Sequence, residues 1–368
     1  MTRPQVGERP AGDGPERTLA GRYARHALVP GWQQSALASA STTVIGVGAL
    51  GNEVARLLAM SGVGELLLCD PDRVAESNLS RCVLFRESDV GQLKVVAARQ
   101  ALAQLAPATL VRIRAAPLDA GIGLADLRDA TLVIGCLDSI AARVLLAQRC
   151  ALAGTGWLDG GTRPWGGEVR RFTAGGACYG CLAGAAGRAT LDNPLGCGAL
   201  VPPTEAGATA PVSALVGAWL ATMAVRMICG LEPGPEAIVL DAAAARLDPL
   251  ALRRSSDCPL HAPIPAELIK QVPLTTAGIV SDALALVAPD EDILTWRGFA
   301  AGNEPDAGPG VPLVNGGRTA TFLRRAGSGT RLRDLGIAPR EILPVAHRAT
   351  AQLRFYFELA AEEPIPEE

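Results

Sequence analysis

A glycine-rich turn early in the chain has the residue types of a phosphate-binding loop. Its glycines are Gly46, Gly48 and Gly51, and the turn lies between a β-branched run, 42–45, and apolar residues at helical spacing over 52–58. Glycine lets the backbone approach phosphate oxygens, and a helix N-terminus offers free N–H groups and the positive end of a dipole. The pattern predicts a strand, a tight turn and a helix. It leaves a simple close turn, a dinucleotide site and an ATP site open.

A carboxylate follows the turn at the distance expected of a ribose-binding acid. Asp70 comes directly after the apolar run 65–69, which reads as the second strand of the unit. A dehydrogenase would share these features, but it would not require the polar set that comes next. These residues are Asp72, Asn78, Arg81 and Lys94.

In this combination, the stretch from Asp70 to Lys94 resembles the nucleotide site of the ubiquitin-activating-enzyme-like superfamily. Its simpler members are the bacterial molybdopterin-synthase and thiamine-pathway adenylyltransferases. The resemblance runs from Arg22 to about His261. It implies a Rossmann-like, doubly wound and mostly parallel α/β sheet that binds ATP with Mg²⁺. It also implies adenylation of the C-terminal carboxylate of a small ubiquitin-like or sulfur-carrier protein, with release of pyrophosphate and, in some members, a later thioester.

The resemblance assigns roles to individual residues. Asp70 would hold the ribose, while Arg81 and Lys94 would contact the triphosphate; Asp72, Asn78 and the three glycines would complete the nucleotide site. Asp138, which follows the β-branched run 131–134, would handle magnesium and the reacting phosphate. Fixed cations and a metal stabilise the charge that builds on phosphoryl oxygens. A lone Arg or Lys is usually a solvated surface residue, so the prediction depends on the ordered set.

The segment 22–26 resembles the Arg-Tyr-x-Arg start of the same superfamily's core. The resemblance implies that Arg25 reaches the ATP of the other subunit, as an arginine finger supplied in trans. A homodimer follows from that role. The alternative is a basic pair on the surface or at a helix cap.

Two short-spaced pairs of potential metal ligands lie far apart in the chain. Cys178 and Cys181 form the first, and Cys258 and His261 form the second. Three thiolates and one imidazole suit tetrahedral zinc, and four protein ligands leave no open position, so a structural site is expected. Related proteins close this site with two cysteine pairs, so His261 is a departure. An unmetallated pair with a surface histidine is the alternative.

The position of a nucleophilic cysteine also departs from the superfamily pattern. Thioester-forming relatives carry a cysteine shortly before a Glu-Ala-Gly-like turn, here 205–207, and this chain has Pro203 at that place. The nearest thiol is Cys197, flanked by glycines, which could serve instead. No neighbouring base is visible that would lower its pKa. Without that step, the adenylate would pass directly to an external nucleophile.

Composition favours an enzyme of the cytoplasm. The net charge is −3 and 49% of the residues are apolar, which gives no basic patch for a nucleic-acid partner. Residues 1–21 lack an apolar core and read as a disordered tail instead of an export signal. The near-apolar run 212–225 ends at Arg226, which is core-helix length, so no membrane span is expected.

The chain divides into two expected domains. An adenylation domain over 22–261 contains an ATP site at 41–143 and a crossover loop and zinc region at 165–261. After a proline-containing linker comes an accessory domain at 266–358 with an α+β or β-rich pattern. Its strand-like runs are 320–324 and 352–357, and the loop 298–317 is expected to be mobile. It could recruit a partner or only stabilise the enzyme.

Two alternative functions stay open. The first is adenylation of a short ribosomal peptide in natural-product biosynthesis without a thioester, which Pro203 favours. The second is a non-catalytic nucleotide-binding scaffold. A scaffold has no need for a complete triphosphate site, and the set formed by Arg25, Asp70, Arg81, Lys94 and Asp138 argues against it.

Overall fold

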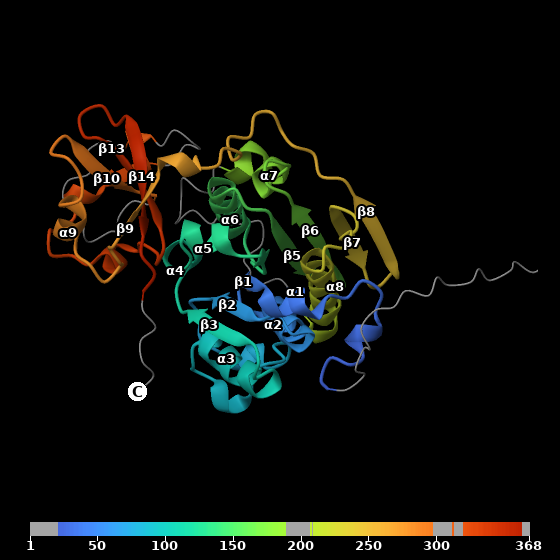
Figure 1. Cartoon of the computed structure of the whole chain (residues 1–368). Coiled ribbons are helices and arrows are strands. Elements are labelled where there is room, and N and C mark those ends of the chain that lie inside the picture. The colour runs from blue at the N-terminus through green and yellow to red at the C-terminus, as the bar shows by residue number, and fades with distance from the viewer. Residues whose placement is uncertain (1–20, 189–206, 208, 297–310, 313–318, 363–368) are drawn as a thin grey trace, which may run out of the picture.

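The computed structural model describes residues 21–188, 207, 209–296, 311–312 and 319–362. These residues form an eight-stranded sheet and a separate six-stranded sheet, with helices around both (Figure 1). The predictions of a disordered N-terminal tail and of a mobile loop at 298–317 concern residues almost wholly outside this range.

The large sheet has the predicted doubly wound arrangement. Its strand order is β3-β2-β1-β4-β5-β6-β7-β8. Pairing is parallel from β3 to β5 and antiparallel from β5 to β8. The strands are β1 (Ser41–Ile45), β2 (Glu65–Cys69), β3 (Leu110–Arg114), β4 (Leu132–Gly135), β5 (Trp157–Arg163), β6 (Gly166–Phe172), β7 (Ala237–Asp241) and β8 (Arg246–Leu250).

Helices cover both faces of this sheet, and each face has its own apolar core. Because both faces are covered, central strands such as β4 are buried along their whole length. One core includes residues of α1 (Gln34–Ser39), α2 (Ala49–Ser61), α3 (Lys94–Leu105) and α8 (Ala210–Ile228). The other includes residues of α4 (Leu118–Gly121), α5 (Leu124–Asp129), α6 (Ile140–Ala153) and α7 (Tyr179–Arg188).

The helix α8 is long and apolar enough, by length and composition, to cross a membrane, and 50% of that apolar window is buried. It packs closely on the sheet and on α2. A Cβ atom added at Gly217 of α8 would lie 2.7 Å from Cβ of Glu53, and one added at Gly167 of β6 would lie 2.5 Å from Val216. In this structure α8 is therefore a core helix, as its sequence predicted.

The C-terminal part of the chain forms a six-stranded sheet in the order β11-β12-β10-β13-β14-β9. All of its pairs are antiparallel except β9 with β14. Its own apolar core includes Val280, Leu343 and Phe357. The elements are β9 (Ile269–Val272), α9 (Val280–Leu284), β10 (Glu291–Thr295), β11 (Val311–Pro312), β12 (Thr319–Phe322), β13 (Ile342–His347) and β14 (Leu353–Leu359).

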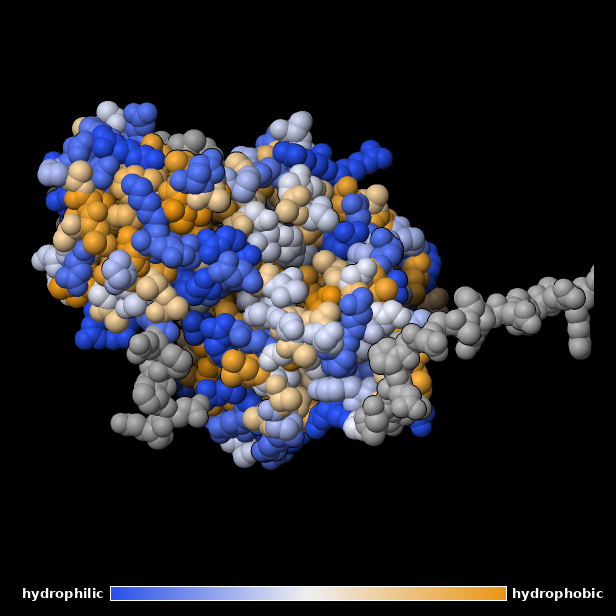
Figure 2. Space-filling model, viewed as in Figure 1, coloured by the Kyte–Doolittle hydropathy of each residue, from blue (hydrophilic) through white to orange (hydrophobic). Residues whose placement is uncertain are grey.

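The C-terminal sheet packs directly against α5 and α6 (Figure 1). Ile342 and Tyr356 join the core cluster that covers the large sheet. A Cβ atom at Gly123 would overlap the backbone of Arg340, which shows how closely the two parts approach. Hydrophilic side chains gather where the two lobes meet on the face shown in Figure 2. Between the two parts, Arg128 of α5 bonds Glu358 of β14 at 2.8 Å.

Candidate functional site

The carboxyl ends of three neighbouring strands meet at one edge of the large sheet. β1 pairs with β2 on one side and with β4 on the other, so that Ile45 lies opposite both Cys69 and Gly135. The strand order reverses at β1. Ligands of open α/β sheets bind in the crevice at such a switch point. The glycine turn, Asp70 and the loop that carries Asp138 follow these three strands, and the fold brings them to this edge.

The three glycines of the turn differ in what a side chain at each position would meet. Gly46 has a φ of +91°, and a Cβ atom there would overlap the carbonyl oxygen of Cys136. A Cβ atom at Gly51 would overlap the carbonyl oxygen of Gly46, so these two positions require glycine for packing. A Cβ atom at Gly48 would meet no atom within 4 Å. Gly48 is the N-cap of α2 and is the glycine that leaves space open beside the helix N-terminus.

Asp70 fixes the glycine turn to the loop that follows β2. One carboxylate oxygen accepts a hydrogen bond from the Val47 N–H at 2.7 Å, and the other accepts one from the Asp72 N–H at 2.8 Å. Only 6% of the residue is exposed. Burial raises the pKa of the Asp70 carboxyl, while the charge of Lys94 and the two N–H bonds oppose that shift. The predicted contact of Asp70 with a ribose stays a prediction.

Asn52 also belongs to this site, although the sequence analysis did not single it out. Its amide nitrogen donates to the carbonyls of Val47 and Gly48, at 2.8 and 3.1 Å, and its amide oxygen accepts from the Leu84 N–H at 2.9 Å. The side chain is fully buried. It therefore ties the glycine turn to the segment that follows Arg81. An amide on the apolar face of the predicted helix was the signal that could have revealed it.

The cationic side chains lie at the start of α3 and in the loop before it. Lys94 is the first residue of α3, and its Nζ bonds Asp72 Oδ2 at 2.7 Å. Arg81 donates from Nη1 to the Ser77 carbonyl at 2.6 Å. Asn78 accepts from the Ala75 N–H at 3.0 Å and so closes the turn beneath Arg81. Lys94 bonds Asp72, and the N–H of Asp72 bonds Asp70, so these three residues form one connected group.

Asp138 lies in the short loop between β4 and α6, and its side chain is exposed. Ser139 caps α6 by accepting a hydrogen bond from the Ala142 N–H at 3.2 Å. A second residue that the sequence analysis missed, Arg143, donates to the Leu137 carbonyl at 2.6 Å. Strand register places this loop beside the glycine turn. The role of Asp138 toward magnesium stays a prediction.

Arg25 lies away from the nucleotide edge of its own chain. The neighbouring Arg22 donates to the Leu105 carbonyl at the C-terminal end of α3, and Tyr23 lies against Gly62 just after α2. The 13 residues of α2 separate that end from the glycine turn. At about 1.5 Å per residue, the separation is roughly 20 Å.

Cys197, Pro203 and the turn residue Glu205 lie outside the described residues. Cys69 and Cys82 are buried among apolar groups, and burial raises the pKa of their thiols, to about 12 for Cys69 and about 11 for Cys82. Cys136 and Cys150 shift in the same direction for the same reason. High thiol pKa values disfavour thiolates, so these four thiols are poor nucleophiles.

The predicted zinc ligands come together from two distant segments. The ligand atoms of Cys178, Cys181, Cys258 and His261 all lie within 4.8 Å of one another. Sγ of Cys178 is 3.8 Å from that of Cys181 and 3.7 Å from that of Cys258. Thiolates about 2.3 Å from a tetrahedral zinc ion lie about 3.8 Å from each other, so the cluster has the dimensions of a zinc site.

The imidazole of this cluster is suited to a metal. His261 Nε2 lies 3.2 Å from Sγ of Cys181. Burial, followed by the charge of Arg254, lowers the pKa of His261, which favours the neutral ring that binds zinc. Zinc here would join the end of the adenylation domain to the segment before α7.

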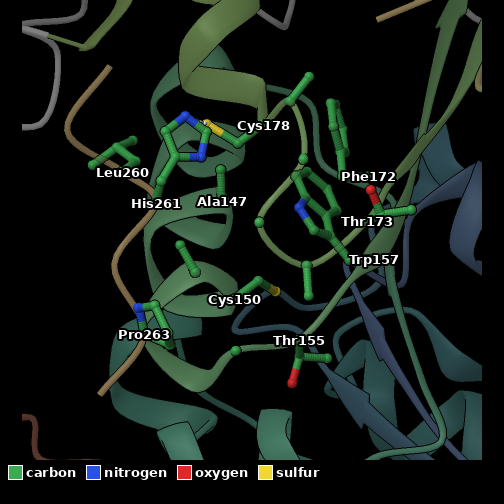
Figure 3. A pocket seen from close by; sticks show the side chains of 16 residues that line it. Ala147, Cys150, Thr155, Trp157, Phe172, Thr173, Cys178, Leu260, His261 and Pro263 are labelled. Atoms are coloured by element: carbon green, nitrogen blue, oxygen red, sulfur yellow. Dashed lines mark hydrogen bonds between the residues drawn. The ribbon is translucent and has the colours of Figure 1, made fainter. Parts of the chain in front are cut away.

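A cavity of about 150 Å³ adjoins this cluster. Figure 3 shows Cys178 and His261 at one end of it and Thr155 and Pro263 at the other, with Trp157 and Phe172 along its wall. Its lining belongs to α6, the turn after β6 and the segment before the C-terminal domain. The cavity is therefore part of the zinc region and is separate from the switch point.

Residues 22–260, about two thirds of the chain, match the ThiF family. Molybdopterin-synthase adenylyltransferase of Escherichia coli is 33% identical over 244 residues, which are 64% of this chain and 94% of the relative. Sulfur carrier protein adenylyltransferase of Thermus thermophilus is 32% identical over 252 residues, which are 65% of this chain and 89% of the relative.

Solved structures confirm the fold of the same region. The microcin C7 biosynthetic enzyme MccB, in complex with N-formylated MccA, has a TM-score of 0.55 at 21% identity. That match covers 68% of this chain and 77% of the other. Fold, sequence match and the resemblance of the nucleotide motifs agree, and this protein belongs to the ThiF family and is a ubiquitin-activating-enzyme-like adenylyltransferase.

Proposed function

We propose that this enzyme uses Mg-ATP to adenylate the C-terminal carboxylate of a small ubiquitin-like or sulfur-carrier protein. The observation that carries the proposal is the convergence of the glycine turn, Asp70 and the Asp138 loop at the switch point. The relatives named molybdopterin-synthase and sulfur carrier protein adenylyltransferases support this class of substrate. A carboxylate oxygen bonds to the α-phosphorus, the bond to the bridging oxygen breaks, and pyrophosphate leaves with that electron pair.

The site residues divide the work of binding and charge stabilisation. The N–H groups at the start of α2 face the phosphates, and the open space at Gly48 admits them. Lys94 and Arg81 offset the charge of the triphosphate, with Lys94 moving from Asp72 to a phosphate oxygen. Asp138 would hold magnesium, which neutralises phosphate charge when bound.

We further propose that the enzyme acts as a homodimer in which Arg25 serves the partner's site. The segment with Arg25 lies near the C-terminal ends of α2 and α3, so it is too far from the glycine turn of its own chain. An arginine supplied in trans would stabilise charge on the departing pyrophosphate. The three zinc-binding thiolates need a reducing compartment, which supports a cytoplasmic location.

Adenylation of a short ribosomal peptide is the second candidate. Pro203 stands where thioester-forming relatives carry cysteine, which favours it. In the first candidate, Cys197 could take the acyl group as a thioester; in the second, the acyl adenylate is the final activated species and no cysteine carries an acyl group.

Exchange of pyrophosphate with ATP tests the proposal. Three substrates are compared: a sulfur-carrier protein that ends in Gly-Gly, the same protein without these two residues, and a short synthetic peptide. We expect exchange with the first alone, with Asp138→Ala inactive but folded. Exchange with the peptide alone would support the second candidate, and intact mass spectrometry would show whether Cys197 carries a thioester.

Subunit mixing tests the dimer. Arg25→Ala and Asp138→Ala should each be inactive, because each damages both sites of a homodimer. A heterodimer of the two has one intact site, so an equal mixture should recover about a quarter of wild-type exchange. A mixture that stays inactive although the subunits demonstrably exchange would rule out action in trans.

A further inference from the structure

The guanidinium group of Arg143 joins the Asp138 loop to the neighbouring strand. Nη2 donates to the Leu137 carbonyl at 2.6 Å and to the Gly160 carbonyl of β5 at 3.1 Å. Nε donates to Asp159 Oδ1 at 3.1 Å. Leu137 directly precedes Asp138, whose own side chain is exposed. The backbone on which Asp138 stands is thus held by one side chain.

Arg143 occupies a position that helix energetics disfavour. It lies in the first turn of α6, where the positive end of the helix dipole repels a cation. Its side chain is only 11% exposed, and its partner Asp159 is fully buried and also bonds Arg170 at 2.8 Å. Replacing buried ion pairs by apolar residues is often neutral or stabilising. Stability alone therefore does not explain this arrangement.

The surroundings leave a fitted space for the guanidinium. A Cβ atom at Gly161 would lie 2.9 Å from Arg143 Nη2, so glycine makes room for it. The ring of Tyr179 covers Arg143 and Arg170, with centroid distances of 5.8 and 5.5 Å to their guanidinium carbons. Tyr179 follows Cys178 of the zinc cluster, so that cluster anchors the aromatic cover.

We propose that Arg143 is a positioning residue that sets the direction of the Asp138 carboxylate through the Leu137 carbonyl. This inference rests on the proposed function. It separates two jobs at the switch point: the glycine turn and Lys94 bind ATP, whereas Arg143 fixes the group that acts at the reacting phosphate. Loss of Arg143 should lower kcat and raise the magnesium requirement, with the KM for ATP little changed.

Pyrophosphate exchange of Arg143→Gln and Arg143→Lys tests the kinetic part. A misplaced reacting group costs up to about 100-fold in rate, and we expect a loss of at least about tenfold for Gln. Lysine keeps the charge but cannot donate to three acceptors in the fork geometry, so it should restore little. Arg163→Gln is the matched control, because Arg163 is 59% exposed at the outer end of the same ion-pair chain, where it bonds Glu168. It should exchange like the wild type.

A double-mutant cycle identifies the path of the effect. If Arg143 acts through Asp138, Arg143→Gln should remove nothing further from the residual exchange of Asp138→Asn, a milder variant than the inactive Asp138→Ala. An additional loss of the same size as in the wild type would overturn the proposal. So would wild-type kcat and magnesium dependence in folded Arg143→Gln.

Hydrogen exchange gives a readout that does not depend on activity. The amides of residues 136–142 should exchange faster in Arg143→Gln than in the wild type. In Arg163→Gln they should exchange at the wild-type rate, with the proteins compared at matched melting temperatures. Unaltered exchange of this loop would contradict positioning. If the loop exchanges faster in Arg143→Gln but the wild-type enzyme catalyses no adenylation, the proposed function has failed and the positioning role has not.

Discussion

Arg149 of α6 and Glu341, the residue directly before β13, form an ion pair at 2.7 Å between the two parts of the chain, with side chains only 4% and 3% exposed. Arg149 also donates to the Ile122 carbonyl at 2.6 Å, and Glu341 accepts from the Leu124 N–H at 3.3 Å. Glu341 also accepts from the Ile342 N–H at 3.1 Å, so each charge has partners from both sides of the interface. The pair joins the accessory sheet to the helix whose first turn follows Asp138.

Breaking that pair should weaken the whole chain. Glu341→Ala leaves the Arg149 guanidinium buried without its counter-charge, which typically costs about 3–5 kcal/mol of unfolding free energy. Urea unfolding followed by far-UV circular dichroism measures the loss. The double variant Arg149→Met with Glu341→Leu should recover most of it. Arg246→Ala, which breaks an exposed pair, should cost less than about 1 kcal/mol, and equal losses in the two single variants would contradict the role of burial.

Two glycines of the nucleotide turn should respond differently to alanine. Gly51→Ala places a methyl group on the Gly46 carbonyl and should destabilise the fold, with a clear drop in melting temperature. Gly48→Ala meets no protein atom, and its φ of −74° suits alanine, so the melting temperature should stay the same. Its ATP affinity, measured by calorimetry, should fall because the methyl group occupies the phosphate's space. Wild-type ATP affinity in Gly48→Ala would show that phosphates bind elsewhere.

Loss of zinc should lower activity through Tyr179, which covers Arg143. His261→Ala removes one ligand of the cluster and should lower both zinc content, measured by mass spectrometry, and the melting temperature. Pyrophosphate exchange should fall in parallel, because the cover on Arg143 loosens. His261→Cys restores four ligands and should keep zinc, stability and exchange. Full exchange by a zinc-free His261→Ala enzyme would show that the zinc cluster does not affect the nucleotide site.

Acid stability should depend on Glu168. Burial raises the pKa of this carboxyl, but Arg170 and Arg163 lower it more, so its folded pKa lies below the ordinary value. Its contribution to stability is therefore present above the unfolded pKa of about 4.3 and is lost as pH falls through the folded pKa. Wild type should be more stable than Glu168→Gln above about pH 5, and the difference in melting temperature should shrink toward pH 3. A constant difference across that range would contradict the shift.

Local patterns predicted the nucleotide half of the molecule well. The strand at 65–69 and the long helix, indicated by the apolar run 212–225 and found at Ala210–Ile228, follow from apolar runs and their ends. The strand expected at 320–324 ends at Phe322, because Leu323 turns into the small C-terminal core and begins a 3₁₀ turn. Burial of a single side chain decided that boundary, and periodicity does not encode it.

Long-range pairs were not predictable in the same way. Arg143, Arg149 and Asn52 sit on helical segments that look ordinary in sequence. Their partners lie 16, 192 and 32 residues away and meet them only through the packing of separate elements. The zinc ligands are the exception. Their short spacing and chemistry predicted a joint site although 80 residues separate Cys178 from Cys258.

The C-terminal sheet begins and ends on neighbouring strands. Ile269 of β9 pairs in parallel with Tyr356 of β14, so the first strand of this lobe lies beside its last strand. In the described part of this sheet β9 stands at the edge and pairs with β14 alone, so the first strand of the lobe can join the sheet only when the last one is present. A chain that stopped before residue 353 would leave β9 without its strand partner, so the lobe depends on its last segment to close.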